Sequence, residues 1–310
     1  MVKYEGKIRK SFILIVFTIV FSVLFLNIIS INKKLEFEIN KKNENKIALE
    51  NLKSDLEILK NKQTNLQIEI DSLKNIDENL EKTKKELFSL AKDLETKIKS
   101  GNSNYKIAYL TFDDGPYYLT NSFLDILDKY DVKATFFTIG YDKETCFDNR
   151  SKECGNMYKK IVDKGHTIAN HTYSHSIFNG LYSSVDTFIY DLKVQEELIK
   201  NKTGVITNIM RFPGGSAQAK NLKTIIINKL KENNYGWVDW TALNGDGGSI
   251  SNKTIGWNNF VNSINDNIEV ILFHDYNHVT LSMLEDAIIY LQNNNYILLP
   301  LFYESVMINK

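Results

Sequence analysis

Two adjacent carboxylates and a pair of histidines are the residues of this sequence best suited to metal chemistry. Asp113 and Asp114 follow an apolar run, and His171 and His175 stand four residues apart. Adjacent carboxylates at a strand end point in different directions, so one can bind a metal while the other acts as a base. Histidines at i and i+4 fall on one face of a helical turn, a spacing that suits one metal ion. The alternatives are an ordinary charged turn and two unrelated polar residues in a loop.

Two further clusters follow apolar runs and fit hydrolytic chemistry. Arg211 can hold a carboxylate in its ionised form, and the segment Pro213-Gly214-Gly215 behind it exposes backbone N–H groups to a ligand. His274 ends another apolar run, where a histidine can act as a general acid. The alternatives are an ordinary strand-to-loop turn at the first cluster and a buried, hydrogen-bonded histidine at the second.

One more β-prone run ends in Asp239 and Trp240. A carboxylate beside an aromatic ring suits contact with a sugar. Both residues are therefore candidates for the site, and a place in the core is the alternative.

Short β-prone runs alternate with helix-like runs beyond residue 104. The β-prone runs are 106–112, 134–139, 167–169, 209–212, 235–240, 270–273 and 296–299. The helix-like runs include 122–130, 183–201, 222–233 and 281–293. This alternation predicts an α/β fold, a distorted (β/α) barrel of about seven parallel strands, with a doubly wound open sheet as the alternative. In either fold the polar clusters at the carboxyl ends of the strands come together as one site.

Residues 33–100 are predicted to form one long helix that serves as a coiled-coil stalk. The segment contains no glycine and no proline, the residues that interrupt helices. Leucine recurs every seven residues, at positions 52, 59, 66, 73, 80, 87 and 94. Such a repeat is typical of coiled coils and would join copies of the chain into a homo-oligomer. The alternatives are a single solvated helix and a helix packed on its own catalytic domain.

Residues 11–32 are predicted to anchor the chain in a membrane. The run from Phe12 to Ile31 is apolar with few interruptions and carries no charge. At about 1.5 Å per residue it would span a bilayer core of roughly 30 Å. A cleaved signal peptide is the alternative, but its apolar region would be about 7–15 residues long, with a small-residue site behind it. We expect a single-pass protein of the cell membrane, with residues 1–10 in the cytoplasm and the C-terminal part outside.

The composition limits the remaining possibilities. Lys+Arg and Asp+Glu both number 38, and this balance argues against a dedicated nucleic-acid binder. Two cysteines, Cys146 and Cys154, exclude a disulfide scaffold and a four-cysteine zinc site, and outside the cell they could form one local disulfide. Residues 101–104 are interpreted as a linker and residues 105–310 as the catalytic domain.

The motifs, taken in this order, resemble the polysaccharide deacetylase (NodB-homology) family of carbohydrate esterases over about residues 105–305. The resemblance implies a metal-assisted N-deacetylase that releases acetate and leaves a sugar with a free amine. It implies one divalent ion, zinc in the first place and cobalt or another ion otherwise, bound by Asp114, His171 and His175. Such an ion would acidify its water and polarise the acetamide carbonyl.

The resemblance also implies the catalytic roles. Asp113 matches the family's base, and Arg211 would hold it in its charged form. His274 matches the general acid that protonates the leaving amine, and Asp239 would orient and tune it. The segment 244–248 is interpreted as a turn-rich loop without a catalytic role.

Four further residues are implied to contact the substrate, namely Leu272, Trp240, Pro213 and Gly214. Leu272 would line the pocket for the acetyl methyl group, and Trp240 would form a wall of the groove. Many family members carry tyrosine after the proline and use its backbone N–H for the oxyanion. Gly214 keeps that N–H but changes the shape of the subsite.

An anchor and a stalk favour an insoluble polymer close to the membrane, and peptidoglycan is the simplest such target. The chain therefore resembles membrane-anchored peptidoglycan N-acetylglucosamine deacetylases, whose product resists lysozyme-type muramidases. N-acetylmuramic acid, chitooligosaccharides and an exopolysaccharide are the alternative substrates. A non-catalytic carbohydrate-binding protein and a coiled-coil surface scaffold are the alternatives of another class.

Overall fold

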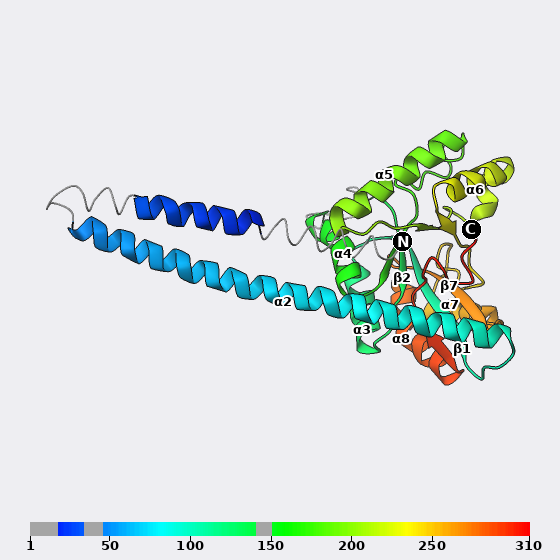
Figure 1. The fold of residues 1–310 in the computed structure, drawn as a ribbon. Coiled ribbons are helices and arrows are strands. Elements are labelled where there is room, and N and C mark those ends of the chain that lie inside the picture. The colour runs from blue at the N-terminus through cyan, green and yellow to red at the C-terminus, as the bar shows by residue number, and fades with distance from the viewer. Residues whose placement is uncertain (1–17, 34–45, 141–150) are drawn as a thin grey trace. The chain divides into compact units, whose positions relative to one another are not determined.

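The computed structural model describes residues 18–33, 46–140 and 151–310 of the chain (Figure 1). It divides into two compact units, Met1–Lys82 and Thr83–Lys310. The second unit contains every candidate site residue.

The first unit contains a helix over residues 18–33 and the greater part of α2 (Lys46–Lys99). The 54 residues of α2 form one uninterrupted helix, as the absence of glycine and proline predicts. Within the described ranges, no helix is both long enough and apolar enough to cross a membrane. The predicted tail 1–10 and residues 11–17 of the predicted anchor lie outside those ranges. Membrane insertion and the pairing of α2 with a second copy stay predictions.

The second unit is built on an eight-stranded sheet whose strands all pair in parallel. The strands are β1 Lys106–Gly115, β2 Thr135–Thr138, β3 Thr167–Asn170, β4 Ile209–Met210, β5 Gly236–Trp237, β6 Ala242–Leu243, β7 Ile268–His274 and β8 Tyr296–Leu298. Their order is β5-β4-β3-β2-β1-β7-β6, and β8 pairs with β1 beside this path. The consecutive strands β5 and β6 are thus the two ends of the path, so the sheet is an open half-barrel. The predicted α/β fold of about seven parallel strands is confirmed.

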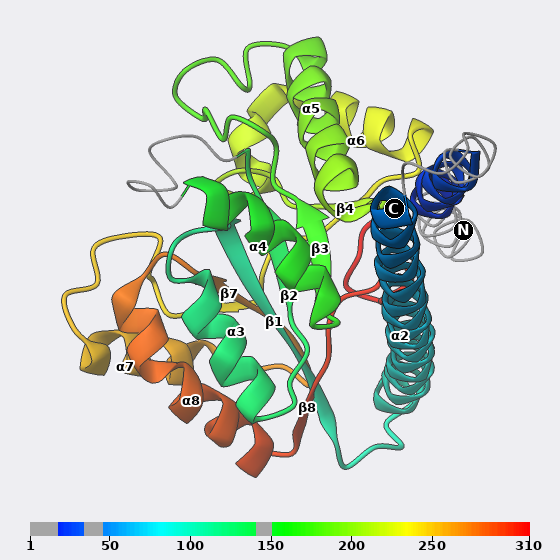
Figure 2. The ribbon, with the colours of Figure 1, turned by 90° about the vertical axis from the view of Figure 1, so that its left-hand side faces the viewer.

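Helices follow most of the strands and cover the sheet. They are α3 Thr120–Lys129, α4 Ser151–Asp163, α5 Val185–Thr203, α6 Lys223–Glu232, α7 Lys253–Ser263 and α8 His278–Asn293, with a 3-10 helix at Ser216–Leu222. Helices α3, α4 and α8 lie over the sheet in Figure 2. Their ends follow from the local sequence: the Ser184 hydroxyl accepts a hydrogen bond from the Thr187 N–H at the start of α5, and Gly204 ends that helix at φ 74°.

Side chains alternate between the two faces of β1, so that one face packs in the hydrophobic core and the other faces the candidate site. Ala108, Leu110 and Phe112 pack with the covering helices. The intervening residues Ile107 and Tyr109 face the other side, toward the interior of the half-barrel. Since side chains alternate along a strand, the same interior face continues through Thr111 to Asp113. The strand therefore carries its catalytic candidate on the interior face by register alone.

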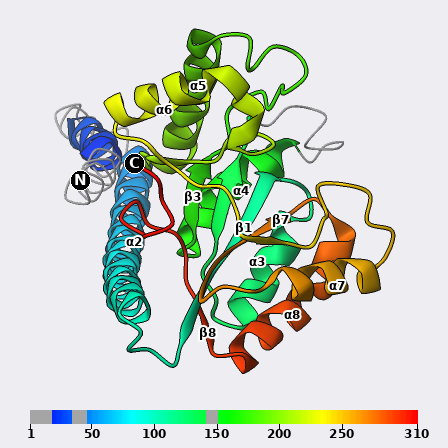
Figure 3. The same cartoon turned by 90° about the vertical axis from the view of Figure 1, so that its right-hand side faces the viewer.

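The last turns of α2 belong to the second unit. Ala91 and Leu94 are buried in one cluster with Ile107 and Tyr109, and Figure 3 shows α2 leading through a short loop into β1. The second unit begins at Thr83, before the linker predicted at residues 101–104, and that domain boundary stays a prediction. The interior face of an open half-barrel needs an apolar cover, and the heptad stripe of α2 provides one.

Candidate active site

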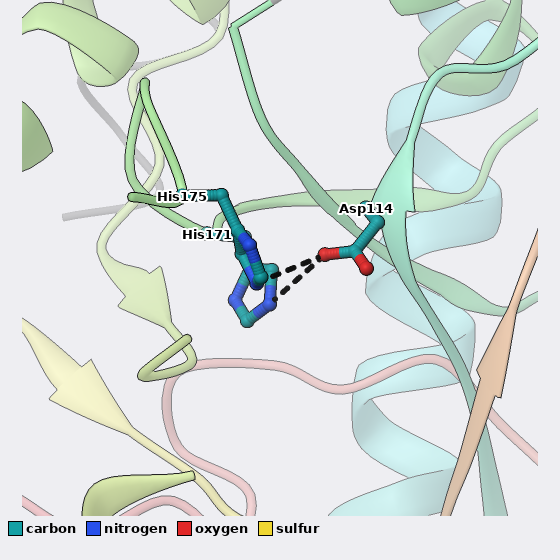
Figure 4. A group of neighbouring side chains, drawn as sticks. All are labelled: Asp114, His171 and His175. Atoms are coloured by element: carbon teal, nitrogen blue, oxygen red, sulfur yellow. Dashed lines mark ion pairs between the residues drawn. The ribbon is translucent and has the colours of Figure 1, made fainter. Parts of the chain in front are cut away.

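Three side chains that could bind one metal ion meet at the carboxyl ends of β1 and β3. One ligand atom from each of Asp114, His171 and His175 lies within 4.8 Å of the others. The Oδ1 atom of Asp114 stands 3.4 Å from Nε2 of His171 and 3.2 Å from Nε2 of His175 (Figure 4). The structure therefore brings together the three residues that the sequence predicted as metal ligands.

The two histidines are held by an irregular turn and not by the helical turn that their spacing suggested. His175 has a left-handed φ of 48°, and Thr172 between the histidines has a φ of 64°. Asn170 Oδ1 accepts a hydrogen bond from the Thr172 N–H, and the Asp191 carboxylate accepts from the next two N–H groups. The side chains of Asn170 and Asp191 thus fix a turn whose left-handed residues, Thr172 and His175, would not adopt this conformation readily by themselves.

The chemistry of this donor set fits a divalent metal. His171 Nδ1 lies 2.8 Å from the Arg211 carbonyl oxygen, so this ring nitrogen is the donor and Nε2 is free to ligate. Burial and the neighbouring His175 hold the pKa of His171 well below its ordinary value, which keeps the ring neutral, as a ligand must be. Asp114 Oδ1 is buried and accepts no hydrogen bond from the described part of the chain. Three protein ligands of this kind are typical of catalytic sites that keep a position open.

Asp113 lies beside the metal ligands and is paired with Arg211. The Arg211 Nη1 atom donates to Asp113 Oδ1 at 2.8 Å and to the Thr111 hydroxyl at 2.8 Å, and both charged side chains are buried. Burial raises the pKa of Asp113 to about 6, against the opposing effect of the Arg211 charge and of His274. The sequence prediction that Arg211 faces the candidate base is confirmed.

His274 ends β7 opposite Asp113 in the register of β1 and β7. Its Nε2 atom lies 3.7 Å from Asp114 Oδ2, so the ring borders the metal ligands. Its Nδ1 atom lies 2.7 Å from Asp246 Oδ1. Burial alone would lower the pKa of His274, but the hydrogen bond and charge of Asp246, with Asp114 and Asp113, raise it to about 9. The ring is thus a proton donor at neutral pH.

The prediction that Asp239 orients His274 is wrong, because Asp246 occupies that place. The Asp239 carboxylate instead accepts hydrogen bonds from the Ser216 N–H at 2.9 Å and from the Ser216 hydroxyl at 2.5 Å. Its backbone oxygen accepts from Arg211 Nη2 at 3.2 Å. Asp239 therefore fixes the glycine-rich loop before Ser216 rather than the histidine.

The segment 244–248, interpreted as a loop without a catalytic role, carries the carboxylate that contacts His274. Asp246 Oδ2 also accepts from the His274 N–H at 2.8 Å and from the Thr280 hydroxyl at 2.5 Å. The signal that could have identified Asp246 is its place directly behind β6, the strand that pairs with β7. A two-residue strand has too few residues to show a pattern in the sequence.

The four predicted substrate contacts lie around these groups. Leu272 precedes His274 by two residues on β7 and so shares its face. The guanidinium carbon of Arg211 lies 5.9 Å from the centroid of the Trp240 ring. The Pro213 carbonyl oxygen accepts a hydrogen bond from the Tyr182 hydroxyl at 2.8 Å. Gly214 has a φ of 70°, a conformation in which glycine is strongly favoured.

The predicted disulfide falls partly outside the described residues. Cys146 lies in the stretch 141–150, of which the structure describes nothing. The pairing of Cys146 with Cys154 stays a prediction.

Comparison with known proteins agrees with this geometry. The sequence model of the polysaccharide deacetylase family matches residues 100–238. A peptidoglycan-N-acetylglucosamine deacetylase of Bacillus cereus is 34% identical over 176 residues, which cover 53% of this chain and 56% of that protein. The chain spans about half the length of the curated relatives that it matches.

Solved structures share the fold as well. The catalytic domain of peptidoglycan N-acetylglucosamine deacetylase from Eubacterium rectale is 34% identical, with a TM-score of 0.59, and the match covers 67% of this chain and 94% of that one. The polysaccharide deacetylase Bc1974 from Bacillus cereus is 28% identical, with a TM-score of 0.56, over 64% of this chain and 94% of that one. The matched parts correspond in extent to the unit that carries the site.

Proposed function

The chain belongs to the polysaccharide deacetylase family, and we propose that it hydrolyses N-acetyl groups of a cell-wall polysaccharide. The observation that carries the proposal is the arrangement of three groups at one sheet edge: the Asp113–Arg211 pair, the cluster of Asp114 with two histidines, and His274 with Asp246. A base, a ligand set and an acid are what amide hydrolysis requires.

The residues divide the reaction between them. A divalent cation bound by Asp114, His171 and His175 would supply Lewis-acid polarisation of the acetyl carbonyl and a more acidic water. Asp113, deprotonated above a pH of about 6, takes the proton from the attacking water. Arg211 keeps that carboxylate oriented through its 2.8 Å hydrogen bond.

His274 completes the reaction on the side of the leaving group. It is protonated at neutral pH because Asp246 stabilises its charged form, and it gives this proton to the departing amine. Asp239 holds the Gly214–Ser216 loop in place through Ser216 and so positions the Gly214 N–H for the acetyl oxygen. Leu272 lies on the same face of β7 as His274, and we assign it the contact with the acetyl methyl group.

The substrate we propose is the N-acetylglucosamine of peptidoglycan, with zinc as the resident metal. The support is the identity of 34% to proteins that bear this activity in their names. The apolar run at residues 11–32 supports attachment to the cell membrane with the catalytic unit outside, and the heptad repeat supports association of copies through α2. Deacetylated glycan would then resist muramidases.

The test is acetate release from purified peptidoglycan by the full chain loaded with zinc or cobalt. Asp113→Asn serves as the control, since it keeps the shape of the site but removes the base. Mass spectrometry of glycan fragments identifies the sugar that loses its acetyl group. Metal-dependent release that Asp113→Asn abolishes supports the proposal. Loss of acetyl from N-acetylmuramic acid, or release only from chitooligosaccharides or an exopolysaccharide, would refute the proposed substrate but would support the proposed deacetylation. Binding of polymer without any release would favour a non-catalytic role.

A further inference from the structure

Asp275, the residue that follows His274 in the sequence, is a buried acid that the proposed reaction does not use. Its side chain is inaccessible to solvent, and no basic side chain is paired with it among the described residues. The Oδ2 atom accepts a hydrogen bond from the Thr120 hydroxyl at 2.5 Å. The Oδ1 atom has no hydrogen-bond partner in the described ranges. A carboxyl group in such surroundings costs stability, so its place calls for an explanation.

The carboxyl group lies directly against the turn that carries the metal ligand. A Cβ atom built on Gly115 would stand 2.3 Å from Asp275 Oδ2, so the turn rests on the carboxyl and residue 115 has no room for a side chain. The preceding residue, Asp114, has a left-handed φ of 70°. A non-glycine residue holds that conformation only where its surroundings enforce it.

Thr120 connects this carboxyl to the far side of the same turn. Its hydroxyl donates to Asp275 and accepts a hydrogen bond from the Tyr117 N–H at 2.7 Å. On the near side, the Gly115 carbonyl oxygen accepts from the Ile139 N–H at 2.9 Å. The backbone from Gly115 to Tyr117, directly after Asp114, is therefore held at both ends, and one of the two supports depends on Asp275.

We propose that Asp275 is a positioning residue that acts through Thr120 to fix the turn of Asp114 and thereby sets the affinity of the metal site. It contacts neither metal nor substrate in this role. The inference rests on the metal site of the proposed function but not on the reaction. Partners that orient a metal ligand from behind typically change metal affinity by about 10–100-fold when they are removed.

The same strand offers a matched control. Glu269 near the start of β7 is also fully buried and accepts a hydrogen bond from a threonine hydroxyl, that of Thr241. Its other oxygen accepts from the Asn265 and Asp266 N–H groups, next to β7. The pair Thr241–Glu269 thus repeats the chemistry of Thr120–Asp275 at the end of the strand remote from the metal ligands.

The experiment measures the Kd of the full chain for Zn²⁺ and Co²⁺ by calorimetry, the absorption spectrum of bound Co²⁺, and the melting temperature of the metal-free chain. Thr120→Val is expected to weaken the Kd by about 10–100-fold and to alter the Co²⁺ spectrum. Thr120→Ser keeps the hydroxyl and should keep the wild-type Kd. Thr241→Val should lower the melting temperature but leave the Kd and the Co²⁺ spectrum unchanged.

The outcomes separate this role from a purely structural one. An equal Kd for Thr120→Val and Thr241→Val overturns the inference, whatever the melting temperatures are. If Asp275→Ala is too unstable to purify, the comparison of Thr120→Val with Thr120→Ser still decides. Wild-type chain that binds metal but releases no acetate would refute the proposed function and leave this test intact. Wild-type chain that binds neither ion would overturn both.

Discussion

The covering of the half-barrel by α2 makes a strong prediction about stability. Leu94 is 6% exposed and packs among the interior residues of the sheet, while Leu90, one turn earlier on the same helix, is 40% exposed. Leu94→Ala should lower the free energy of unfolding of the catalytic unit by about 2–5 kcal/mol, the range for buried leucines. Leu90→Ala, a matched change on the outer face, should cost less than about 1 kcal/mol.

A polar contact adds to this effect. Glu95 Oε1 accepts hydrogen bonds from the buried Tyr109 hydroxyl at 2.5 Å and from the Val306 N–H at 3.0 Å. A fragment of residues 102–310 leaves these donors without their acceptor, at about 1–3 kcal/mol, and exposes the surface under Leu94, at about 1.5–3 kcal/mol. Together these losses approach the lower end of the 5–15 kcal/mol that holds a domain folded.

The assay is urea unfolding followed by tryptophan fluorescence, because all three tryptophans lie in the catalytic unit, at positions 237, 240 and 257. The fragments 83–310 and 102–310 are compared with the two leucine variants. Equal midpoints for Leu94→Ala and Leu90→Ala would refute the packing of α2 on the sheet. An undiminished stability of 102–310 would support the boundary that the sequence suggested. A change in oligomeric state with no change in unfolding would instead favour the coiled-coil alternative for this stretch.

Three further predictions concern the site. The profile of activity against pH should be bell-shaped, because activity falls as pH drops through the pKa of Asp113 and as pH rises through the pKa of His274. The acidic limb should lie at or below about 6 and the basic limb at or below about 9, since a bound cation favours the deprotonated form of both groups. Asp246→Asn should lower kcat by about 10–100-fold and shift the basic limb to lower pH, while the metal affinity stays unchanged. Asp239→Asn should leave the basic limb in place. The reverse pattern would contradict the hydrogen bonds of these two carboxylates. Removal of the metal by a chelator should abolish activity. Zinc at 100 times its Kd should raise the free energy of unfolding by about 2.7 kcal/mol, and His175→Ala should remove this effect. A melting temperature that does not depend on zinc would refute the ligand set.

The sequence predicts that the candidate ligands, base and acid lie together, because each stands at the end of a recognisable strand. Parallel strands bring their carboxyl ends to one edge, so Asp114, His171 and His274 had to meet if the strands were correctly placed. The register of β1 against β7 confirms this, since Asp113 lies opposite His274. Here local pattern and global topology agree.

The partner of His274 could not be predicted in the same way. Asp239 and Asp246 both follow β-prone residues, and only the pairing of β6 with β7 decides which carboxylate reaches the ring. That pairing joins residues about 30 positions apart through a two-residue strand, which leaves no periodic signal. The distinction is a property of the sheet and not of the local sequence.

The use of the heptad stripe shows a second kind of limit. Leucines every seven residues indicate that one face of α2 is buried, but the spacing does not identify what buries it. Toward the end of the helix, Ala91 and Leu94 are buried by β1 and the C-terminal segment of the same chain. An apolar stripe is satisfied by any complementary surface, and the open side of the half-barrel supplies one.

The burial of Arg211 with Asp113 explains how the site obtains a base near neutral pH. A buried ion pair gains little stability, because desolvation offsets most of the attraction between the charges. Here burial pushes the pKa of Asp113 upward while Arg211 pulls it down, and the result of about 6 lies close to the pH at which a hydrolase works. An exposed aspartate would be a weaker base, and one buried without Arg211 would stay protonated. The pair is thus better explained by the demands of the reaction than by those of folding.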